Sequence, residues 1–418
     1  MEVDQKRLRE DILANADFGE FDTDEGYGRT VLTGTVADKK VRERLINRMQ
    51  AEGLTVRVDP VGNIAGKWVP NGVDPEKPPV AMGSHLDSVP QGGIFDGPLG
   101  VYGALEAVRA IQESNTSPTR PLEVVSFTEE EGGRFGIGTL GSSVATGQLP
   151  VDDALSLTDN DGYTLADRLN AIGFNGDDVI DPSTWDSWLE LHIEQGTRLE
   201  ERGAEVGVVN SITGITNCRV EIRGEADHAG ATPMSDRSDA LVAGSEFVQA
   251  VETVATDVAT RHPTAVATVG HQTVNPNIRN IVPGDVKMEL DIRDVSQQTM
   301  DDLVARIHEN LERLTHTRSV TVELERFRND APSHMSDRCI ATALKAADTR
   351  EITIDQLHSA AMHDTANISS VTDSGLLFAP SKEGISHNPK EWTDWSDCAS
   401  ATALLAETAI RLASDNTS

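Results

Sequence analysis

The sequence predicts an α/β protein in which one discontinuous domain is interrupted by a smaller α+β domain. The chain has 418 residues, more than one ordinary hydrophobic core supports, which favours two or three units. The middle of the chain alternates strand and helix patterns in the order β-α-β-β-α-β. Short apolar segments that end in polar residues suited to chemistry lie on both sides of this middle part. We therefore expect the flanking segments to fold together as one α/β domain.

The middle part is predicted to be a ferredoxin-like unit. Alternating or apolar runs predict strands over 219–225, 264–274, 286–293 and 319–325. Helices are expected over 233–258 and 297–314, because apolar residues recur there at helical spacing, in the first helix at Leu241, Val242, Phe247, Val248, Val251 and Val254. This order of elements is that of the ferredoxin-like motif. The predicted domains are 1–212, 213–328 and 329–418, with the first and third forming one unit.

A strand that ends in His85 is the first segment suited to chemistry. The apolar run 79–82 predicts a buried strand, and Gly83-Ser84-His85-Leu86-Asp87 follows it. Residues two apart on an extended backbone face the same way, so we expect the Asp87 carboxylate to accept the second ring N–H of His85. The glycine-rich run 92–100 then places Asp96 on a loop, where a carboxylate can bridge two cations.

Three further segments carry potential metal ligands. The strand 124–128 runs into Glu129, Glu130 and Glu131, whose carboxylates repel one another unless cations neutralise them; a solvated acidic loop is the alternative. His192 and His387 lie in the segments 188–196 and 384–389, and either histidine taken alone is more often a buried core residue than a metal ligand. The hypothesis of a metal centre depends on the convergence of five residues: His85, Asp96, Glu131, His192 and His387.

The chain resembles a known enzyme family over nearly its whole length. The motifs are GSHLDSVPQGGIFDGPLGV, FTEEEGGRFG, ELHIEQG, GEADHAGATPM, NPNIRNIVPG, DIRD and SKEGISHNPKEWT. They resemble the dinuclear-metal amidohydrolases that cleave N-carbamoyl amino acids, allantoate and ureidopropionate, a branch of the M20 peptidase and aminoacylase superfamily. The resemblance implies a zinc-peptidase-like catalytic domain, with a mixed sheet flanked by helices. It also implies that the inserted domain serves as a lid and a dimer interface.

The resemblance also implies a role for each candidate ligand. His85 and His192 would each help to hold one metal ion, Glu131 and His387 would hold the other, and Asp96 would bridge them. A histidine at 192, where the wider superfamily has a carboxylate, is typical of the carbamoylase-like branch. Zinc suits these ligands, as do manganese, cobalt and nickel.

Catalytic roles fall on three further residues. Glu130, beside the ligand Glu131, is placed to act as general base on a metal-activated water, and Asp87 supports His85. His228 matches the family histidine that stabilises the oxyanion and often comes from the partner subunit. An ordinary capping or interface histidine is the alternative for His228.

Substrate recognition is expected from Arg293, Asn277 and Gln195, which match family residues that bind the carboxylate end of the substrate. A surface ion pair of Arg293 with Asp291 or Asp294 is the alternative. The chain departs from the family at 359–365, where Ala360 and Met362 replace glycines and predict a smaller or differently shaped pocket. The segment 214–219 also lacks the Gln-Arg-Trp run of relatives.

The predicted reaction is hydrolysis of an N-carbamoyl-L-amino acid to the amino acid, ammonia and carbon dioxide. Allantoate amidohydrolase and β-ureidopropionase remain alternatives, since all three substrates share a ureido group and a carboxylate. An aminoacylase or dipeptidase is a further alternative, which His192 speaks against. A non-enzymatic binding protein is disfavoured because every candidate ligand and Glu130 are present.

Charge and cysteine content set the expected environment. Asp and Glu number 68 against 36 Lys and Arg, for a net charge of −32, which indicates adaptation to a salt-rich cytoplasm. Such a charge argues against nucleic acid and anionic membranes as partners. Cys218, Cys339 and Cys398 show no metal-type spacing and fit a reducing compartment. We expect a cytoplasmic homodimer without a secretory leader or membrane span.

Overall fold

The computed structural model describes residues 1–414 and divides into two compact units. The first unit comprises Met1–Ile212 and His334–Ser418, and the second comprises Thr213–Ser333. The second boundary lies five residues beyond the predicted 328, because strand β14 (Thr321–Asp330) continues past Glu325. The last four residues of the predicted segment 329–418 lie outside the described residues.

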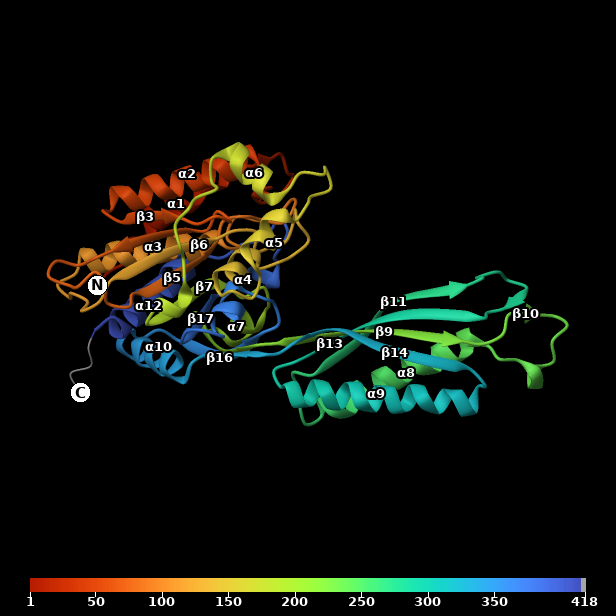
Figure 1. Cartoon of the computed structure of the whole chain (residues 1–418). Coiled ribbons are helices and arrows are strands. Elements are labelled where there is room, and N and C mark those ends of the chain that lie inside the picture. The colour runs from red at the N-terminus through yellow and green to blue at the C-terminus, as the bar shows by residue number, and fades with distance from the viewer. Residues whose placement is uncertain (415–418) are drawn as a thin grey trace. The chain divides into compact units, whose positions relative to one another are not determined.

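A nine-stranded mixed sheet forms the centre of the first unit (Figure 1). Its strands run in the order β15-β8-β17-β7-β5-β6-β4-β3, and β16 pairs with β8. Strands β6, β5, β7 and β17 are mutually parallel neighbours, whereas β4 and β8 are antiparallel to this group. The strands are β3 (Thr55–Val58), β4 (Ile64–Trp68), β5 (Val80–His85), β6 (Leu122–Phe127), β7 (Ser187–Ile193), β8 (Val206–Ile212), β15 (Ser333–His334), β16 (Ile354–Ser359) and β17 (Ser374–Ala379).

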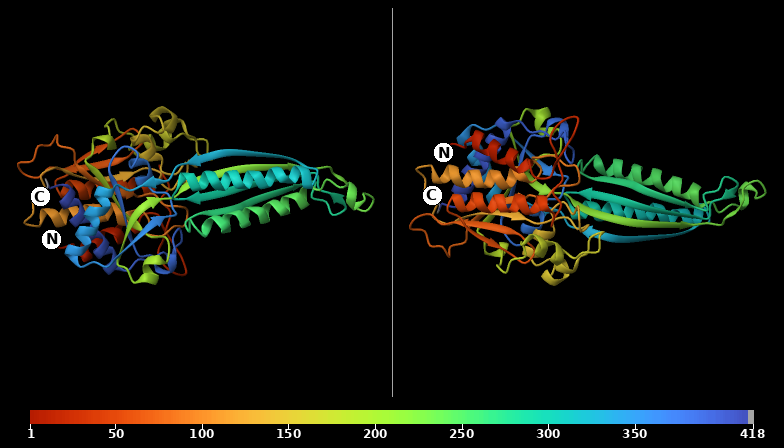
Figure 2. Two further views of the ribbon diagram at one scale, coloured as in Figure 1. Left: turned by 90° about the horizontal axis from the view of Figure 1, so that it is seen from below. Right: turned by 90° about the horizontal axis from the view of Figure 1, so that it is seen from above.

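Helices cover the sheet, so the predicted mixed sheet flanked by helices is confirmed (Figure 2). They are α1 (Gln5–Ala16), α2 (Val36–Ala51), α3 (Pro98–Gln112), α4 (Leu140–Ala145), α5 (Val151–Ser156), α6 (Leu165–Ile172), α7 (Arg198–Arg202), α10 (Asp337–Arg350), α11 (Asp364–Ile368) and α12 (Trp395–Leu412). Short elements complete the unit: β1 (Glu20–Phe21), β2 (Gly28–Arg29), η1 (Pro182–Thr184) and η3 (Lys382–Gly384).

The central strands are buried on both faces. Val80 and Met82 of β5 belong to the large core cluster that includes residues of α1, α3 and α12. Ala81, the residue between them, belongs to a second cluster with Trp185 and Trp188. Every residue of β5, β6 and β7 is buried, as expected for parallel strands covered on both sides.

The second unit has the predicted order β-α-β-β-α-β. Strands β9 (Gly214–Arg223), β11 (Val266–Asn275), β13 (Asp285–Asp294) and β14 form a sheet in the order β11-β13-β9-β14, which is ferredoxin-like. Helices α8 (Ala240–Ala259) and α9 (Gln297–Thr317) pack on this sheet around one apolar core (Figure 1). A small pair, β10 (Asp227–His228) with β12 (Ile281–Val282), and η2 (Met234–Asp236) complete the unit.

Helix α8 begins later than the predicted residue 233. The Asp239 side chain accepts hydrogen bonds from the backbone N–H groups of Leu241 and Val242 and caps the helix there. The preceding residues form η2 and an extended connection instead. Among residues 1–414, no helix is both long and apolar enough to cross a membrane.

Candidate metal centre

The predicted metal ligands meet at the carboxyl end of the parallel strands. Strand β5 ends in His85, β6 leads into the segment of Glu131, β7 carries His192 near its end, and β17 leads towards His387. The carboxyl ends of parallel strands lie at one edge of a sheet, where α/β proteins bind ligands. Segments far apart in the sequence are brought together by this parallel arrangement.

Asp96 reaches the same place because Gly97 lets the chain turn sharply into helix α3. Gly97 has a φ of 82°, a conformation that favours glycine, and a Cβ there would lie 2.5 Å from Cε1 of His85. The loop therefore packs directly against the imidazole, with the Asp96 carboxylate beside it.

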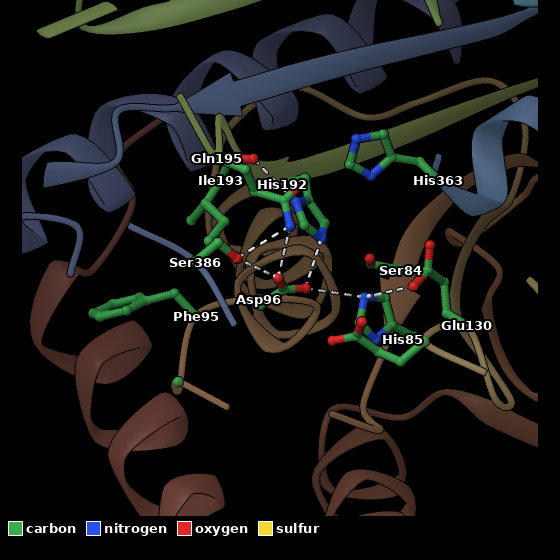
Figure 3. A network of polar contacts seen from close by, with 12 residues as sticks. Ser84, His85, Phe95, Asp96, Glu130, His192, Ile193, Gln195, His363 and Ser386 are labelled. Atoms are coloured by element: carbon green, nitrogen blue, oxygen red, sulfur yellow. Dashed lines mark hydrogen bonds and ion pairs between the residues drawn. The ribbon is translucent and has the colours of Figure 1, made fainter. Parts of the chain in front are cut away.

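Two groups of potential ligands share Asp96, as Figure 3 shows for the first. We call His85, Asp96 and His192 the inner group; Asp96 Oδ1 lies 3.4 Å from His85 Nε2 and 3.2 Å from His192 Nε2. We call Asp96, Glu131 and His387 the outer group. His387 Nε2 lies 3.4 Å from Asp96 Oδ2 and 3.3 Å from Glu131 Oε2. In each group the ligand atoms lie within 4.8 Å of one another, close enough to hold a metal ion.

Backbone carbonyls orient both histidines of the inner group. Nδ1 of His192 lies 3.0 Å from the carbonyl oxygen of Ile193, and Nδ1 of His85 lies 3.1 Å from that of Asp87. With Nδ1–H as the donor, Nε2 of each neutral ring presents a lone pair to the Asp96 side. Nε2 of His85 is buried and has no hydrogen-bond partner in the described part of the chain. This donor set fits a divalent cation.

The prediction for the Asp87 carboxylate was wrong. Its Oδ1 lies 3.7 Å from His85 Nδ1, while the Asp87 carbonyl oxygen takes the hydrogen bond. The carboxylate instead accepts the backbone N–H groups of Glu130 at 3.2 Å and Glu131 at 3.1 Å. Asp87 lies beyond the end of β5, and its carboxylate contacts the segment that follows β6. Asp87 thus positions the acidic segment as well as His85.

The site concentrates negative charge that a cation would neutralise. Burial, with repulsion from Asp96, raises the pKa of Glu131 to about 7. Burial likewise raises the pKa of Glu130 well above its usual range, and although His85 opposes this, Asp364 and Glu131 add to it. Burial lowers the pKa of His85, but Glu130, Asp96 and Asp87 outweigh it and raise that pKa well above its usual value. A positive charge, whether a proton or a metal ion, is therefore favoured between these groups.

Glu130 lies where a proton acceptor for a site-bound water would be needed. Its Oε2 is 3.7 Å from His85 Nε2, and the side chain is buried at the edge of the inner group (Figure 3). The three acids of the predicted segment thus separate: Glu131 belongs to the outer group, Glu130 lies beside the inner group, and Glu129 accepts backbone N–H groups of Arg134 and Phe135.

Gln195 contacts the centre itself. Its Nε2 donates to Asp96 Oδ2 at 2.8 Å and to Ser386 Oγ at 3.1 Å, and the hydroxyl of Ser386 lies 2.8 Å from the same Asp96 oxygen (Figure 3). Gln195 therefore orients the shared carboxylate in this structure, a contact that the predicted role in substrate binding did not include.

A buried hydrogen-bond network next to the ligands was not predicted from the sequence. Glu190, fully buried in β7, accepts hydrogen bonds from the hydroxyl of Ser84, next to His85, and from the backbone and hydroxyl of Thr365. Trp188 Nε1 donates to the Thr365 hydroxyl at 2.7 Å. A glutamate within the apolar run of β7 was the available signal. The network joins β5, β7 and α11 directly under the inner group.

The structure shows where the Met362 side chain packs, and the predicted change of pocket shape stays a prediction. Met362 is partly buried and packs against the apolar cluster that contains Leu357 and Phe378. The adjacent His363 is buried, with its ring 4.5 Å from that of His192. Met362 therefore contributes to the core, and His363 is the residue of this segment that faces the inner group.

Three of the predicted site residues belong to the second unit. His228 is exposed, and its Nδ1 accepts the backbone N–H groups of Gly230 and Ala231, both at 3.0 Å, which leaves the proton of the neutral ring on Nε2. Asn277 is exposed and has a φ of 52°. Arg293 Nε pairs with Asp291 Oδ1 at 2.8 Å, which is the ion pair considered as its alternative role.

Comparisons with known proteins find relatives that cover most of the chain. A family model described as peptidase family M20/M25/M40 matches residues 81–411. An N-carbamoyl-L-amino-acid amidohydrolase of Paenarthrobacter aurescens is 38% identical over 385 residues, which cover 91% of this chain and 92% of the relative. A ureidoglycolate hydrolase of Arabidopsis thaliana is 34% identical, covering 91% of this chain and 81% of the relative. A hydantoinase/carbamoylase family amidase from Burkholderia multivorans superposes with a TM-score of 0.91 at 32% identity, covering 100% of this chain and 99% of that structure.

Proposed function

The chain belongs to peptidase family M20/M25/M40, and we propose that it is a metal-dependent amidohydrolase that cleaves the ureido C–N bond of an N-carbamoyl-L-amino acid. The observation that carries this proposal is the pair of ligand groups that share Asp96. Two oxygen- and nitrogen-rich groups joined by one carboxylate suit a pair of divalent cations better than a single ion. The relative from Paenarthrobacter aurescens, whose name states this activity, supports the choice of substrate class.

The proposed cofactor is a pair of divalent ions, with zinc as the first choice and manganese, cobalt or nickel as alternatives. The inner group would hold one ion and the outer group the other, with Asp96 between them. When bound, such ions supply Lewis acidity, which lowers the pKa of water and polarises a carbonyl oxygen.

Glu130 would move the protons of the reaction. The buried carboxylate would take a proton from the attacking water and later return it, and burial raises its pKa above the usual range of a glutamate. Attack on the ureido carbon forms the new C–O bond. Glu130 then returns the proton to the terminal nitrogen, the C–N bond breaks, and ammonia leaves. The second proton of the water stays with the remaining N-carboxy group. It moves to the amine nitrogen as carbon dioxide leaves, so the atoms balance for one ureido group and one water.

Residues of the second unit would complete the reaction in this proposal. Because Nδ1 of His228 accepts two backbone N–H groups, its Nε2–H can donate to the oxyanion. Arg293 would exchange Asp291 for the substrate carboxylate, and Asn277 would orient the same end. We further propose that this unit acts as a lid and joins two chains into a dimer, and that the net charge of −32 suits a salt-rich cytoplasm.

The reaction is tested by ammonia release from the purified full-length protein in molar salt with added zinc, manganese or cobalt. N-carbamoyl-L-amino acids, ureidopropionate, allantoate and ureidoglycolate are compared side by side, with N-acetyl amino acids as controls. Ammonia from N-carbamoyl-L-amino acids above the other substrates supports the proposal. Preference for another ureido acid would make that acid the proposed substrate instead. Acetate release from the controls without ammonia release from the ureido acids would contradict the ureido reaction.

The role of Glu130 is tested by Glu130→Gln. We expect kcat to fall about 10²- to 10⁴-fold, the usual contribution of general acid–base catalysis, because the amide cannot carry the proton. Metal content should remain that of the wild type, since Glu130 lies outside both ligand groups. Activity near the wild-type value, or loss of metal, would contradict its assignment as the base.

The role of His228 is tested by His228→Ala. We expect kcat to fall about 10²- to 10³-fold, as for the loss of one oxyanion donor, with metal content unchanged. His271→Ala, the same change at another exposed histidine of the second unit, serves as the control. Unchanged kcat in His228→Ala would favour the alternative role of His228 as an ordinary capping or interface histidine.

A further inference from the structure

A buried arginine lies directly behind the loop that carries Asp96. Arg29, at the end of β2, is fully buried, and its Nε donates to the carbonyl oxygen of Gly93 at 3.0 Å. Its Nη2 lies 3.4 Å from the carbonyl oxygens of both Asp87 and Asp96. The backbone N–H of Arg29 also donates to the carbonyl of Gly92 at 3.0 Å. Arg29 therefore binds the carbonyl oxygens of Gly92, Gly93 and Asp96 in the loop 92–96. It also binds the carbonyl oxygen of Asp87, in the segment after His85.

A buried glutamate holds the other side of the same loop. Oε1 of Glu391 accepts the backbone N–H groups of Phe95 at 2.8 Å and Asp96 at 3.1 Å. Glu391 is 1% exposed and comes from the C-terminal part of the chain, 362 residues after Arg29. A Cβ on Gly93 would overlap the Glu391 side chain, so the loop packs tightly against it.

These two charges are costly where they lie. A buried cation beside a cation-binding centre repels the metal, and Nη1 of Arg29 is buried without a hydrogen-bond partner among the described residues. Their common target explains their presence: both bind the backbone of Asp96, the residue that the two ligand groups share. Ser386 extends the arrangement, because its hydroxyl lies 2.8 Å from Asp96 Oδ2 and 3.3 Å from Glu391 Oε2.

We propose that Arg29 and Glu391 are positioning residues that together fix the Asp96 loop in the geometry needed to hold metal. The inference rests on the proposed metal-dependent function. Arg29 provides a planar fork that reaches three carbonyl oxygens, which a lysine ammonium on a flexible stem cannot reproduce. Glu391 provides a charged acceptor for two N–H groups, which a neutral amide binds less strongly. Arg29 lies outside the residues matched by the family model.

The test is zinc affinity of the metal-free full-length protein, measured by competition with a chelator, for Arg29→Lys and Glu391→Gln. Outer-sphere partners of metal ligands typically contribute 10- to 100-fold to affinity, and we expect a loss of that size in both variants. Thermal unfolding without metal is measured in parallel, because a purely structural role would lower stability and leave zinc affinity unchanged. Glu391→Gln preserves shape, so it tests the proposal even when Arg29→Lys does not fold.

Matched controls come from buried ion pairs away from the centre. Arg109→Lys alters a buried arginine that pairs with Asp11 and Glu52, and Glu123→Gln alters a buried glutamate that accepts from Trp185. We expect both controls to lose stability and to keep wild-type zinc affinity. Equal zinc affinity in the wild type, Arg29→Lys and Glu391→Gln would overturn the proposal, as would an equal loss in the controls. A wild-type protein that binds no zinc, manganese or cobalt would overturn the proposed function as well.

Discussion

The inner and outer ligand groups share Asp96 but differ in how the chain holds their histidines. His85 and His192 lie at buried strand ends, and a backbone carbonyl orients each ring. His387 lies between η3 and α12, its side chain is 49% exposed, and its φ is 54°. The sheet therefore preorganises the inner group, whereas the outer group depends on a loop. We infer that the inner site binds metal more tightly and that the outer site exchanges metal more readily.

Removing the carboxylate that both groups share should abolish metal binding at both of them. In Asp96→Asn we expect both metals to be lost, because each group would retain only two of its three ligands and the bridging charge would disappear. Metal analysis after dialysis measures this, with turnover falling to the background. Asp59→Asn changes a buried aspartate of the first unit that accepts hydrogen bonds from Val61 and Asn63, and it should keep both metals. One metal retained by Asp96→Asn would show that the groups do not share this ligand.

Removing one histidine from each group should remove one metal at a time. We expect His387→Ala to lose only the more weakly bound metal. It should also lower the stability of the metal-free protein at neutral pH, because it removes a protonated imidazole that pairs with Asp96 and Glu131. His192→Ala should lose the tightly bound metal and about 1–3 kcal/mol of stability, since it leaves a cavity in the sheet.

Metal titrations and thermal unfolding of these two variants provide the measurements. Loss of the tight site in His387→Ala would reverse the order of affinity that we infer.

Lowering the pH should weaken metal binding by the outer group in two steps, as His387 and then Glu131 become protonated. A hydrogen bond to Asp96, with the charge of Glu131, raises the pKa of His387 to about 9, so its imidazole holds a proton at neutral pH in the metal-free protein. A ligand must lose that proton, and apparent affinity should therefore fall about tenfold per unit as the pH drops below 9. The pKa of Glu131, raised by burial to about 7, adds a second proton below that pH and should steepen the dependence.

Metal titrations between pH 6 and 9.5 measure this slope, and His387→Ala is the control that removes the first proton. A slope that does not change in this variant would mean that His387 is not an outer ligand.

The site residues that could be predicted from the sequence are those in short local motifs. His85, Asp96, Glu131, His192 and His387 lie in short local motifs, and the parallel strands bring them together as expected. The Asp87 prediction failed because it assumed a continued strand, whereas β5 ends at His85. The contact of Met362 with the apolar cluster beside β16 and β17 could not be predicted from the sequence, because only the packed sheet provides that cluster.

Side chains that bind distant residues of the site are not indicated by a local sequence pattern. Arg29, Ser386 and Glu391 stand in segments without strong periodicity, and their partners lie far away along the chain. Glu190 is a partial exception, because a glutamate within the apolar run of β7 is unusual. A single sequence carries no information on which distant carbonyl or N–H group such a side chain meets.

The sequence by itself determined the α/β class, the inserted β-α-β-β-α-β unit and the identity of the potential ligands, because periodicity and short motifs are local properties. The tertiary structure alone decided that Asp96 is shared by two groups and that its loop lies between Arg29 and Glu391. It also decided that one histidine is half-exposed while two are buried. The physical reason is that distances, burial and charge interactions between segments hundreds of residues apart arise only when the sheet is assembled and packed.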